Sequence, residues 1–160
     1  SFGTGHHETT KLMIKEILKA DFSNKTVLDM GCGTSVLAIL ASLRGAKSIL
    51  AIDIDEWCFN NSLENILLNN IKNITVKQGD ASLLKNHHFD IILANINRNI
   101  LMQDIQYYAT SLNEEGELYM SGFYKEDISY IKEECAKHQL EFCYYHQDKQ
   151  WVVTKFKKGK

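Results

Sequence analysis

A glycine-containing loop is the segment of this sequence that is best suited to bind a ligand. Asp29-Met30-Gly31-Cys32-Gly33-Thr34 follows a short apolar run and precedes a stretch with helical spacing. Glycines at such a turn let the backbone approach a ligand at the edge of an open α/β sheet. Asp53 ends the next apolar run, 22 residues after Gly31, where its carboxylate can accept hydrogen bonds from both ribose hydroxyls. The spacing therefore predicts a ligand that contains a nucleoside.

Two details of this loop indicate which nucleoside ligand it takes. A dinucleotide site uses a third glycine for close helix packing beside the pyrophosphate, and the equivalent position here is Val36. Asp29 would repel a pyrophosphate, but it would favour a cofactor that carries a sulfonium and an α-ammonium group. We therefore predict an S-adenosylmethionine site that includes Asp29, Gly31, Gly33 and Asp53. An ordinary glycine turn and a nicotinamide dinucleotide site are the alternatives.

Polar residues that end two further apolar runs belong to the same predicted edge. Asp80 can reach the exocyclic amine of an adenine, and a plain turn aspartate is the rival interpretation. Asn95 ends a strand that we expect beside the strand of the glycine loop, so its amide points into the same crevice, unless it only caps the strand. Asn97 and Arg98 follow, and we interpret them as a helix cap and a solvated arginine rather than substrate contacts.

The beginning of the chain is a second segment that could contact a ligand. Phe2-Gly3-Thr4-Gly5 has glycines that let the backbone approach a ligand, and Thr9-Thr10 lies at a predicted helix start, which suits the carboxylate of the methionine end of the cofactor. Two histidine pairs, His6-His7 and His87-His88, lack a carboxylate or cysteine at ligand spacing. We therefore predict no metal site.

The elements that must position these residues alternate between short apolar runs and stretches of helical period, which is typical of an α/β fold. We predict helices over residues 8–20, 36–45, 56–69, 100–112 and 126–138, and strands over 26–29, 48–53, 74–77, 89–95, 117–121, 141–146 and 151–156. The short link between the last two strands suits an antiparallel hairpin. The prediction is an open, mainly parallel sheet with helices on both faces, a C-terminal antiparallel hairpin and a solvated or disordered tail over residues 155–160.

The composition is consistent with a single domain that needs no disulfide. The chain has 160 residues, of which 44% are hydrophobic, and its formal net charge of -2 offers no basic field for nucleic acid. Its four cysteines contain no Cys-x-x-Cys pair, and no segment resembles a secretory leader. No apolar run approaches the ~20 residues of a membrane span. We expect a soluble, cytoplasmic protein with reduced thiols and no membrane or direct nucleic-acid partner.

Several of these segments, taken in order, resemble the ribosomal-protein methyltransferase family called PrmA. The similarity is carried by Phe-Gly-Thr-Gly-His-His-Glu-Thr-Thr at residues 2–10 and by residues 27–33, 51–55, 89–96 and 151–153, and it extends over essentially the whole chain. All class I methyltransferases share the glycine loop, whereas the opening segment with its paired threonines is much more specific to this family.

The resemblance implies a class I, Rossmann-like methyltransferase that methylates lysine side chains and the terminal amine of the eleventh protein of the large ribosomal subunit. Carried over position by position, the cofactor contacts of the family fall on Thr10, Gly31, Asp53 and Asn95, with Phe2 and Thr4 in the same pocket. Family members also have an amino-terminal domain that recognises the ribosomal protein. This chain begins inside the first motif, so we expect a catalytic fragment, residues 1–160, without that domain.

The expected chemistry is an in-line displacement in which the protein mainly supplies alignment. We predict that Asn95 accepts a hydrogen bond from the attacking amine and orients its lone pair. Asn95-Ile96-Asn97-Arg98 replaces the Asn-Pro-Pro of many amine and amide methyltransferases, which departs from the wider group and agrees with PrmA. A methyltransferase for RNA or a small molecule, a nicotinamide-dependent oxidoreductase and a binding module without activity remain as alternatives, and the sequence predicts no oligomeric state.

Overall fold

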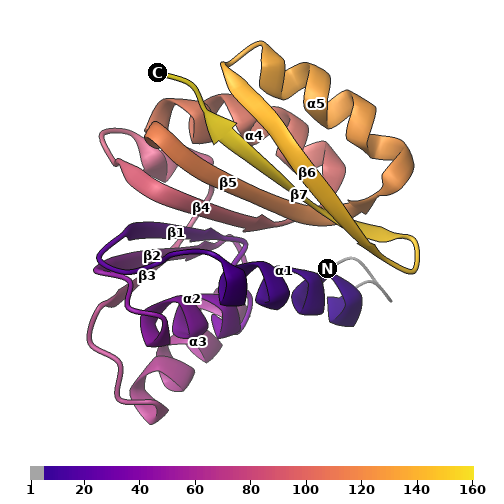
Figure 1. The fold of residues 1–160 in the computed structure, drawn as a ribbon. Helices are drawn as coiled ribbons and strands as arrows, with labels where there is room; N and C mark the ends of the chain where they lie inside the picture. Colours follow the sequence, from indigo (N-terminus) through magenta and orange to yellow (C-terminus); the bar gives the residue numbers. More distant parts are fainter. Residues whose placement is uncertain (1–5) are drawn as a thin grey trace.

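The computed structural model describes residues 6–160, which form a seven-stranded sheet with helices on both faces (Figure 1). The helices are α1 (His6–Lys19), α2 (Val36–Leu43), α3 (Glu56–Leu68), α4 (Arg98–Ser111) and α5 (Ile128–Ala136), with the 3-10 helices η2 (Ala81–Leu84) and η3 (Lys125–Asp127). The strands are β1 (Thr26–Met30), β2 (Ser48–Asp53), β3 (Ile74–Gln78), β4 (Phe89–Asn95), β5 (Leu112–Tyr124), β6 (Leu140–Asp148) and β7 (Trp151–Lys158). None of the described helices is long and apolar enough to cross a membrane.

The strands lie in the order β3-β2-β1-β4-β5-β7-β6. β1 to β5 pair in parallel, and β7 pairs antiparallel with both β5 and β6, which confirms the predicted open sheet with a C-terminal hairpin. Because β1 pairs with both β2 and β4, the loops that follow these three strands meet at one edge. The strand order reverses between β1 and β4, and open α/β sheets bind their ligands at such a switch point.

Both faces of the central strands are covered, which explains their nearly continuous apolar sequence. Helices α1, α2 and α3 lie on one face of the sheet, and α4 and α5 lie on the other (Figure 1). Successive side chains of β1 alternate between the two cores, with Val27 packed in the cluster of α1 and α2 and Leu28 in that of α4 and α5. This packing fixes the end of β1, where the glycine loop begins.

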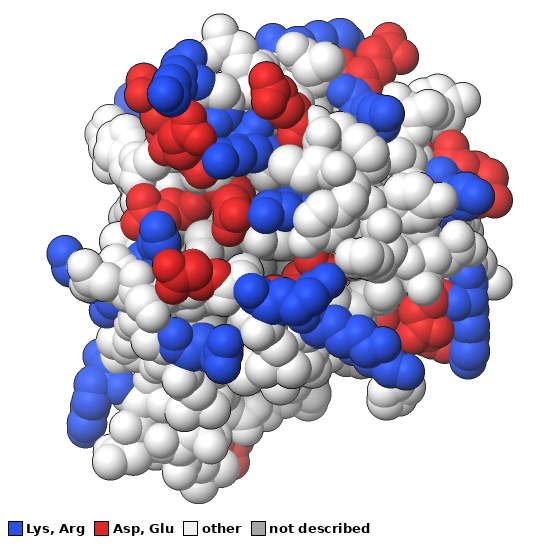
Figure 2. Space-filling model, in the orientation of Figure 1, with Lys and Arg blue, Asp and Glu red and all other residues white. Residues whose placement is uncertain are grey.

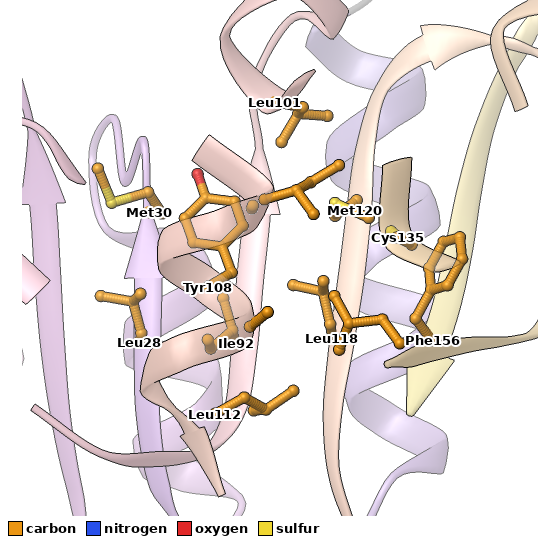
Figure 3. Packing of buried hydrophobic residues seen from close by; sticks show 14 of the residues in the cluster. Leu28, Met30, Ile92, Leu101, Tyr108, Leu112, Leu118, Met120, Cys135 and Phe156 are labelled. Carbon is orange, nitrogen blue, oxygen red and sulfur yellow. The ribbon is translucent and has the colours of Figure 1, made fainter. Parts of the chain in front are cut away.

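Tyr108 of α4 is among the largest fully buried side chains in the described part of the chain. Figure 3 shows its ring packed over the sheet near Leu28 and Ile92, with the hydroxyl at the far end of the ring. That hydroxyl has no hydrogen-bond partner. The ring therefore stabilises the core mainly through apolar contact. Asp104, one turn earlier on α4, lies near the carboxyl edge of the sheet.

The C-terminal third differs from the sequence prediction in the lengths of its elements. β5 begins directly after α4 and extends three residues beyond Ser121, and the helix predicted over residues 126–138 divides into η3 and α5. The carboxylate of Asp127 accepts the backbone amide of Tyr124, which starts the turn at η3. The prediction of a solvated or disordered tail was wrong for β7, because Phe156 is fully buried and the Lys158 ammonium donates to the carbonyls of Ala109 and Leu112 at 2.6 and 2.8 Å.

Charges of both signs are interspersed on the face shown in Figure 2. Lysines at positions 11, 15 and 19 follow one side of α1. Lys11 lies 3.8 Å from the Asp148 carboxylate, and Lys19 lies 3.1 Å from that of Glu16. Two of these three lysines thus lie close to an acidic side chain.

Candidate functional site

Two neighbouring cavities lie at the carboxyl ends of β1, β2 and β4. Cavity A, of about 190 Å³, is lined in part by Gly79, Asp80, Ile96, Asn97, Ile100 and Asp104. Cavity B, of about 470 Å³, is lined in part by Thr10, Gly33, Thr34, Val36, Trp57 and Cys58. Gly31, Asp53, Ile54 and Asn95 line both cavities, so one elongated ligand could contact both sides of these four residues.

Gly31 brings the glycine loop close to the end of β4. Its backbone has φ +73°, and its amide donates to the carbonyl of Ile52 at 2.8 Å. A Cβ atom at this position would lie 2.6 Å from Cγ1 of Ile96, which is far too close. Gly31 is therefore required both by its backbone conformation and by the close approach of Ile96.

Asp53 holds the second half of the loop through its carboxylate. One oxygen accepts the amide of Gly33 at 2.9 Å, and the other accepts the amide of Asp55 at 3.0 Å. Gly33 has φ +56° and open space where a Cβ would be, so its conformation rather than a contact favours glycine. Each carboxylate oxygen of Asp53 keeps a further lone pair for a ligand hydroxyl.

Asp29 lies beneath the loop rather than in the wall of either cavity. Its side chain is fully buried, and neither carboxyl oxygen has a hydrogen-bond partner. Burial raises the pKa of Asp29 to about 7, and the negative charge of Asp53 also raises it. The nearby backbone amide of Ala38 lowers the pKa in part, without forming an aligned hydrogen bond. The sequence analysis included Asp29 in the S-adenosylmethionine site because of its charge, and since Asp29 lines neither cavity its position leaves an influence through that charge.

Asp80 and Asn97 each cap a helical segment and also line cavity A. One oxygen of Asp80 accepts both the amide and the hydroxyl of Ser82, which caps η2, and the residue also lines cavity A. Asn97 caps α4 by accepting the amide of Ile100 at 3.1 Å, and it lines the same cavity. Arg98 forms an ion pair with Asp127 at 3.1 Å and lies outside both cavities.

Asn95 lies where the two cavities meet. Its side-chain oxygen is buried and has no hydrogen-bond partner, although such an amide oxygen normally accepts one or two. Thr10 of α1 lines cavity B. Phe2 and Thr4, which the sequence assigned to the same pocket, lie outside the described residues.

Two residues of α3 that the sequence analysis did not single out hold the glycine loop from behind. The Ser62 hydroxyl donates to the carbonyl of Gly33 at 2.8 Å and accepts the hydroxyl of Ser35 at 2.7 Å. The Asn65 amide donates to the carbonyl of Thr34 at 3.0 Å. Ser62 shares a helix face with the apolar Ile66, and a polar residue on an otherwise buried face was the available signal.

Ser62→Ala should lower the free energy of unfolding by about 1 to 3 kcal/mol, because the buried groups of Gly33 and Ser35 lose their partner. Urea unfolding followed by circular dichroism measures the change. Thr110→Ala is the matched control, since Thr110 bonds only to its own helix at Gln106 and should change stability by less than about 0.5 kcal/mol. Equal effects of the two substitutions would contradict a supporting role for Ser62.

The walls of the two cavities suit an uncharged nucleoside joined to a polar or charged chain. Cavity A offers apolar walls and carboxylates, and cavity B offers hydroxyl and backbone groups around the glycine loop. Across residues 7–160, no group of three or more His, Cys, Asp or Glu side chains is arranged to hold a metal ion.

Comparisons with known proteins agree with this geometry. The chain matches the model of a family described as ribosomal protein L11 methyltransferase (PrmA) over residues 1–159. It is 55% identical over 157 residues to the ribosomal protein L11 methyltransferase of Phocaeicola vulgatus and 54% identical to that of Bacteroides fragilis, in each case covering 98% of this chain and 56% of the relative. The chain thus spans about half the length of the curated relatives it matches.

A solved structure has the same fold as this chain. The crystal structure of a ribosomal protein L11 methylase from Lactobacillus delbrueckii subsp. bulgaricus is similar with a TM-score of 0.91 and 31% identity, covering 98% of this chain and 81% of that chain. The match of fold, sequence and family model covers both cavity-forming loops. The chain belongs to the ribosomal protein L11 methyltransferase (PrmA) family.

Proposed function

We propose that the chain binds S-adenosylmethionine across the two cavities, with the nucleoside in cavity A and the methionine end in cavity B. Asp53 lines both, and its free lone pairs suit the ribose hydroxyls that lie between base and sulfur. The open space where a Cβ of Gly33 would lie, in the wall of cavity B, suits close approach of the ligand to the backbone. The Thr10 hydroxyl in cavity B suits the carboxylate of the methionine end.

We further propose that the chain is a protein amine methyltransferase in which Asn95 orients the amine. The observation that carries this proposal is the buried Asn95 oxygen, which has no partner and lies where the cavities meet. When bound, S-adenosylmethionine supplies a methyl group activated on a sulfonium. The Asn95 oxygen accepts an N–H of the amine and so directs the nitrogen lone pair, but an amide cannot take up the proton. A lysine amine, with a pKa of about 10.4 in water, must therefore lose its proton to solvent before it attacks.

The proposed substrate is the ribosomal protein L11 named in the family description, methylated on lysine side chains and its terminal amine. Such a substrate implies a cytoplasmic location. We propose that residues 1–160 form the cofactor-binding methyltransferase domain and that substrate recognition uses a further domain, since this chain spans 56% of its relatives.

Calorimetric titration and a transfer assay together test this function. The chain should bind S-adenosylmethionine and S-adenosylhomocysteine and should not bind NAD. With labelled S-adenosylmethionine, L11 should receive methyl groups, while ribosomal RNA should not. Binding of NAD alone would overturn the cofactor proposal. Binding of S-adenosylmethionine without transfer to L11, even when this chain replaces the matching segment within the full-length Phocaeicola vulgatus relative, would reduce the chain to a binding module.

Asp53→Asn should raise the dissociation constant for S-adenosylhomocysteine by about 10- to 100-fold, because an amide replaces one charged acceptor and presents a donor to a backbone amide. Asp90→Asn is the matched control. Asp90 also accepts backbone and side-chain donors, from Thr26, but it lies at the start of β4, the opposite end of the strand that Asn95 terminates. Calorimetry should show an unchanged dissociation constant for the control, and an equal loss in both variants would contradict a ligand role for Asp53.

A further inference from the structure

Asp104 is a third carboxylate in cavity A, beside Asp53 and Asp80, and it comes from α4, whereas Asp53 ends β2 and Asp80 follows β3. It lines cavity A and is absent from the walls of cavity B. Because Asp53 belongs to both cavities and is proposed to bind the ribose, Asp104 lies toward the nucleobase end of the ligand.

The three carboxylates differ in how much of their accepting capacity the protein uses. Asp53 accepts two backbone amides, and one oxygen of Asp80 accepts two donors from Ser82. The hydroxyl of Tyr108, one turn further along α4, is close enough to influence Asp104 but is not aligned as a hydrogen bond. With the Tyr108 hydroxyl as the nearby donor, the Asp104 carboxylate keeps most of its accepting capacity for a ligand.

The surroundings of Asp104 favour a hydrogen-bond donor. Burial and then the charge of Asp80 raise the pKa of Asp104. The ionised form of Asp104 is therefore unfavourable unless a hydrogen-bond donor stabilises it. Ile54 and Ile100, from β2's end and from α4, supply apolar surface in the same cavity. A flat base between such side chains would present its edge, rather than its face, to the carboxylates.

We propose that Asp104 sets the nucleobase specificity of the site by accepting a hydrogen bond from the exocyclic amino group of adenine; this inference rests on the proposed cofactor. A carboxylate is an acceptor only, so it pairs with a 6-amino group and repels the lone pairs of a 6-oxo group. A site built to bind a donor rejects the analogue that lacks it, because its own polar group is left unpaired. A ligand with hypoxanthine in place of adenine therefore tests whether Asp104 accepts a hydrogen bond from the 6-amino group.

Calorimetry with S-adenosylhomocysteine and S-inosylhomocysteine tests the assignment. The unsubstituted chain should prefer the adenosyl ligand by about 10- to 100-fold. Asp104→Asn, whose amide can also donate to a 6-oxo group, should narrow that preference to a few-fold, mainly by improving binding of the inosyl ligand. Asp80→Asn should narrow it less, because one Asp80 oxygen already caps η2. Gln106→Ala, a surface change on the same helix outside cavity A, should leave both affinities and their ratio unchanged.

The possible outcomes separate the two proposals. If the unsubstituted chain binds neither ligand, the proposed function fails. If it binds the adenosyl ligand and Asp104→Asn keeps the full preference, with its unfolding midpoint unchanged, the assignment of Asp104 is overturned while the function stands. A preference lost equally in Gln106→Ala would also overturn the assignment, because it would reflect a general disturbance of α4.

Discussion

Asn95→Ala is expected to lower the methyl-transfer rate constant by about 100-fold while it changes the dissociation constant of S-adenosylhomocysteine by only a few-fold. The reason is that the buried Asn95 oxygen has no partner within the described chain and is therefore available to align the amine. Loss of alignment of about 1 Å can cost about 100-fold in rate. The proposed contacts of the nucleoside with Asp53 and with the backbone at Gly31 do not involve Asn95, so its affinity should be largely retained.

Single-turnover transfer to L11, combined with calorimetry, separates the two effects. Asn113→Ala is the matched control: Asn113 donates to Asp90 near the start of β4, away from both cavities, so rate and affinity should stay unchanged. If Asn95→Ala lowers rate and affinity by the same factor, Asn95 is a cofactor contact and does not orient the amine.

Asp29→Asn is expected to make the protein more stable than the unsubstituted chain by up to about 4 kcal/mol near pH 8, a difference that shrinks to about 2 kcal/mol near pH 5. Burial raises the pKa of Asp29 from 3.8 to about 7 in the folded state. Between these values the unfolded chain ionises while the folded chain keeps its proton, so folding stability falls as pH rises and then levels off above about 7. The difference between the two pKa values corresponds to about 4 kcal/mol.

Urea unfolding near pH 5 and near pH 8 measures this difference. Asp90→Asn is the control, because the pKa of Asp90 is shifted in the opposite direction to that of Asp29. Burial would raise the pKa of Asp90, but hydrogen bonds from Thr26 and Asn113 outweigh burial and lower it. The stability that Asp90 contributes is therefore present at neutral pH and lost as pH falls through its folded pKa, so its substitution should destabilise near pH 8. An Asp29→Asn protein with the same pH dependence as the unsubstituted chain would contradict the assignment.

The position of Asp29 also connects stability with binding. A buried carboxylate without a partner lowers stability when ionised, yet its charge lies beneath the loop that is proposed to receive a cationic cofactor. We expect Asp29→Asn to bind S-adenosylmethionine more weakly than the unsubstituted chain despite its greater stability. Such an exchange of stability for function is common at binding sites.

Local patterns in the sequence determined the order and type of almost every element. Apolar runs of strand length, stretches of helical period and the stop at Gly45 depend on neighbouring residues, so the sheet from β1 to β4 and the final hairpin could be predicted. The glycine loop was predictable for the same reason, since a turn that requires positive φ selects glycine locally. The lengths of β5 and β7 were not, because Phe156 and Lys158 are held by packing and by carbonyls distant in sequence.

Only the tertiary structure decided how the polar side chains divide between ligand, loop and core. The sequence placed Asp29 and Asp53 at the ends of adjacent strands, but their opposite environments, one without partners and one bonded to two amides, arise from packing around the loop. Ser62 and Asp104 reach the site from helices whose rotation is set by their contacts with the sheet. Secondary structure follows from interactions between near neighbours, whereas burial and hydrogen-bond partners depend on residues that meet only in the folded chain.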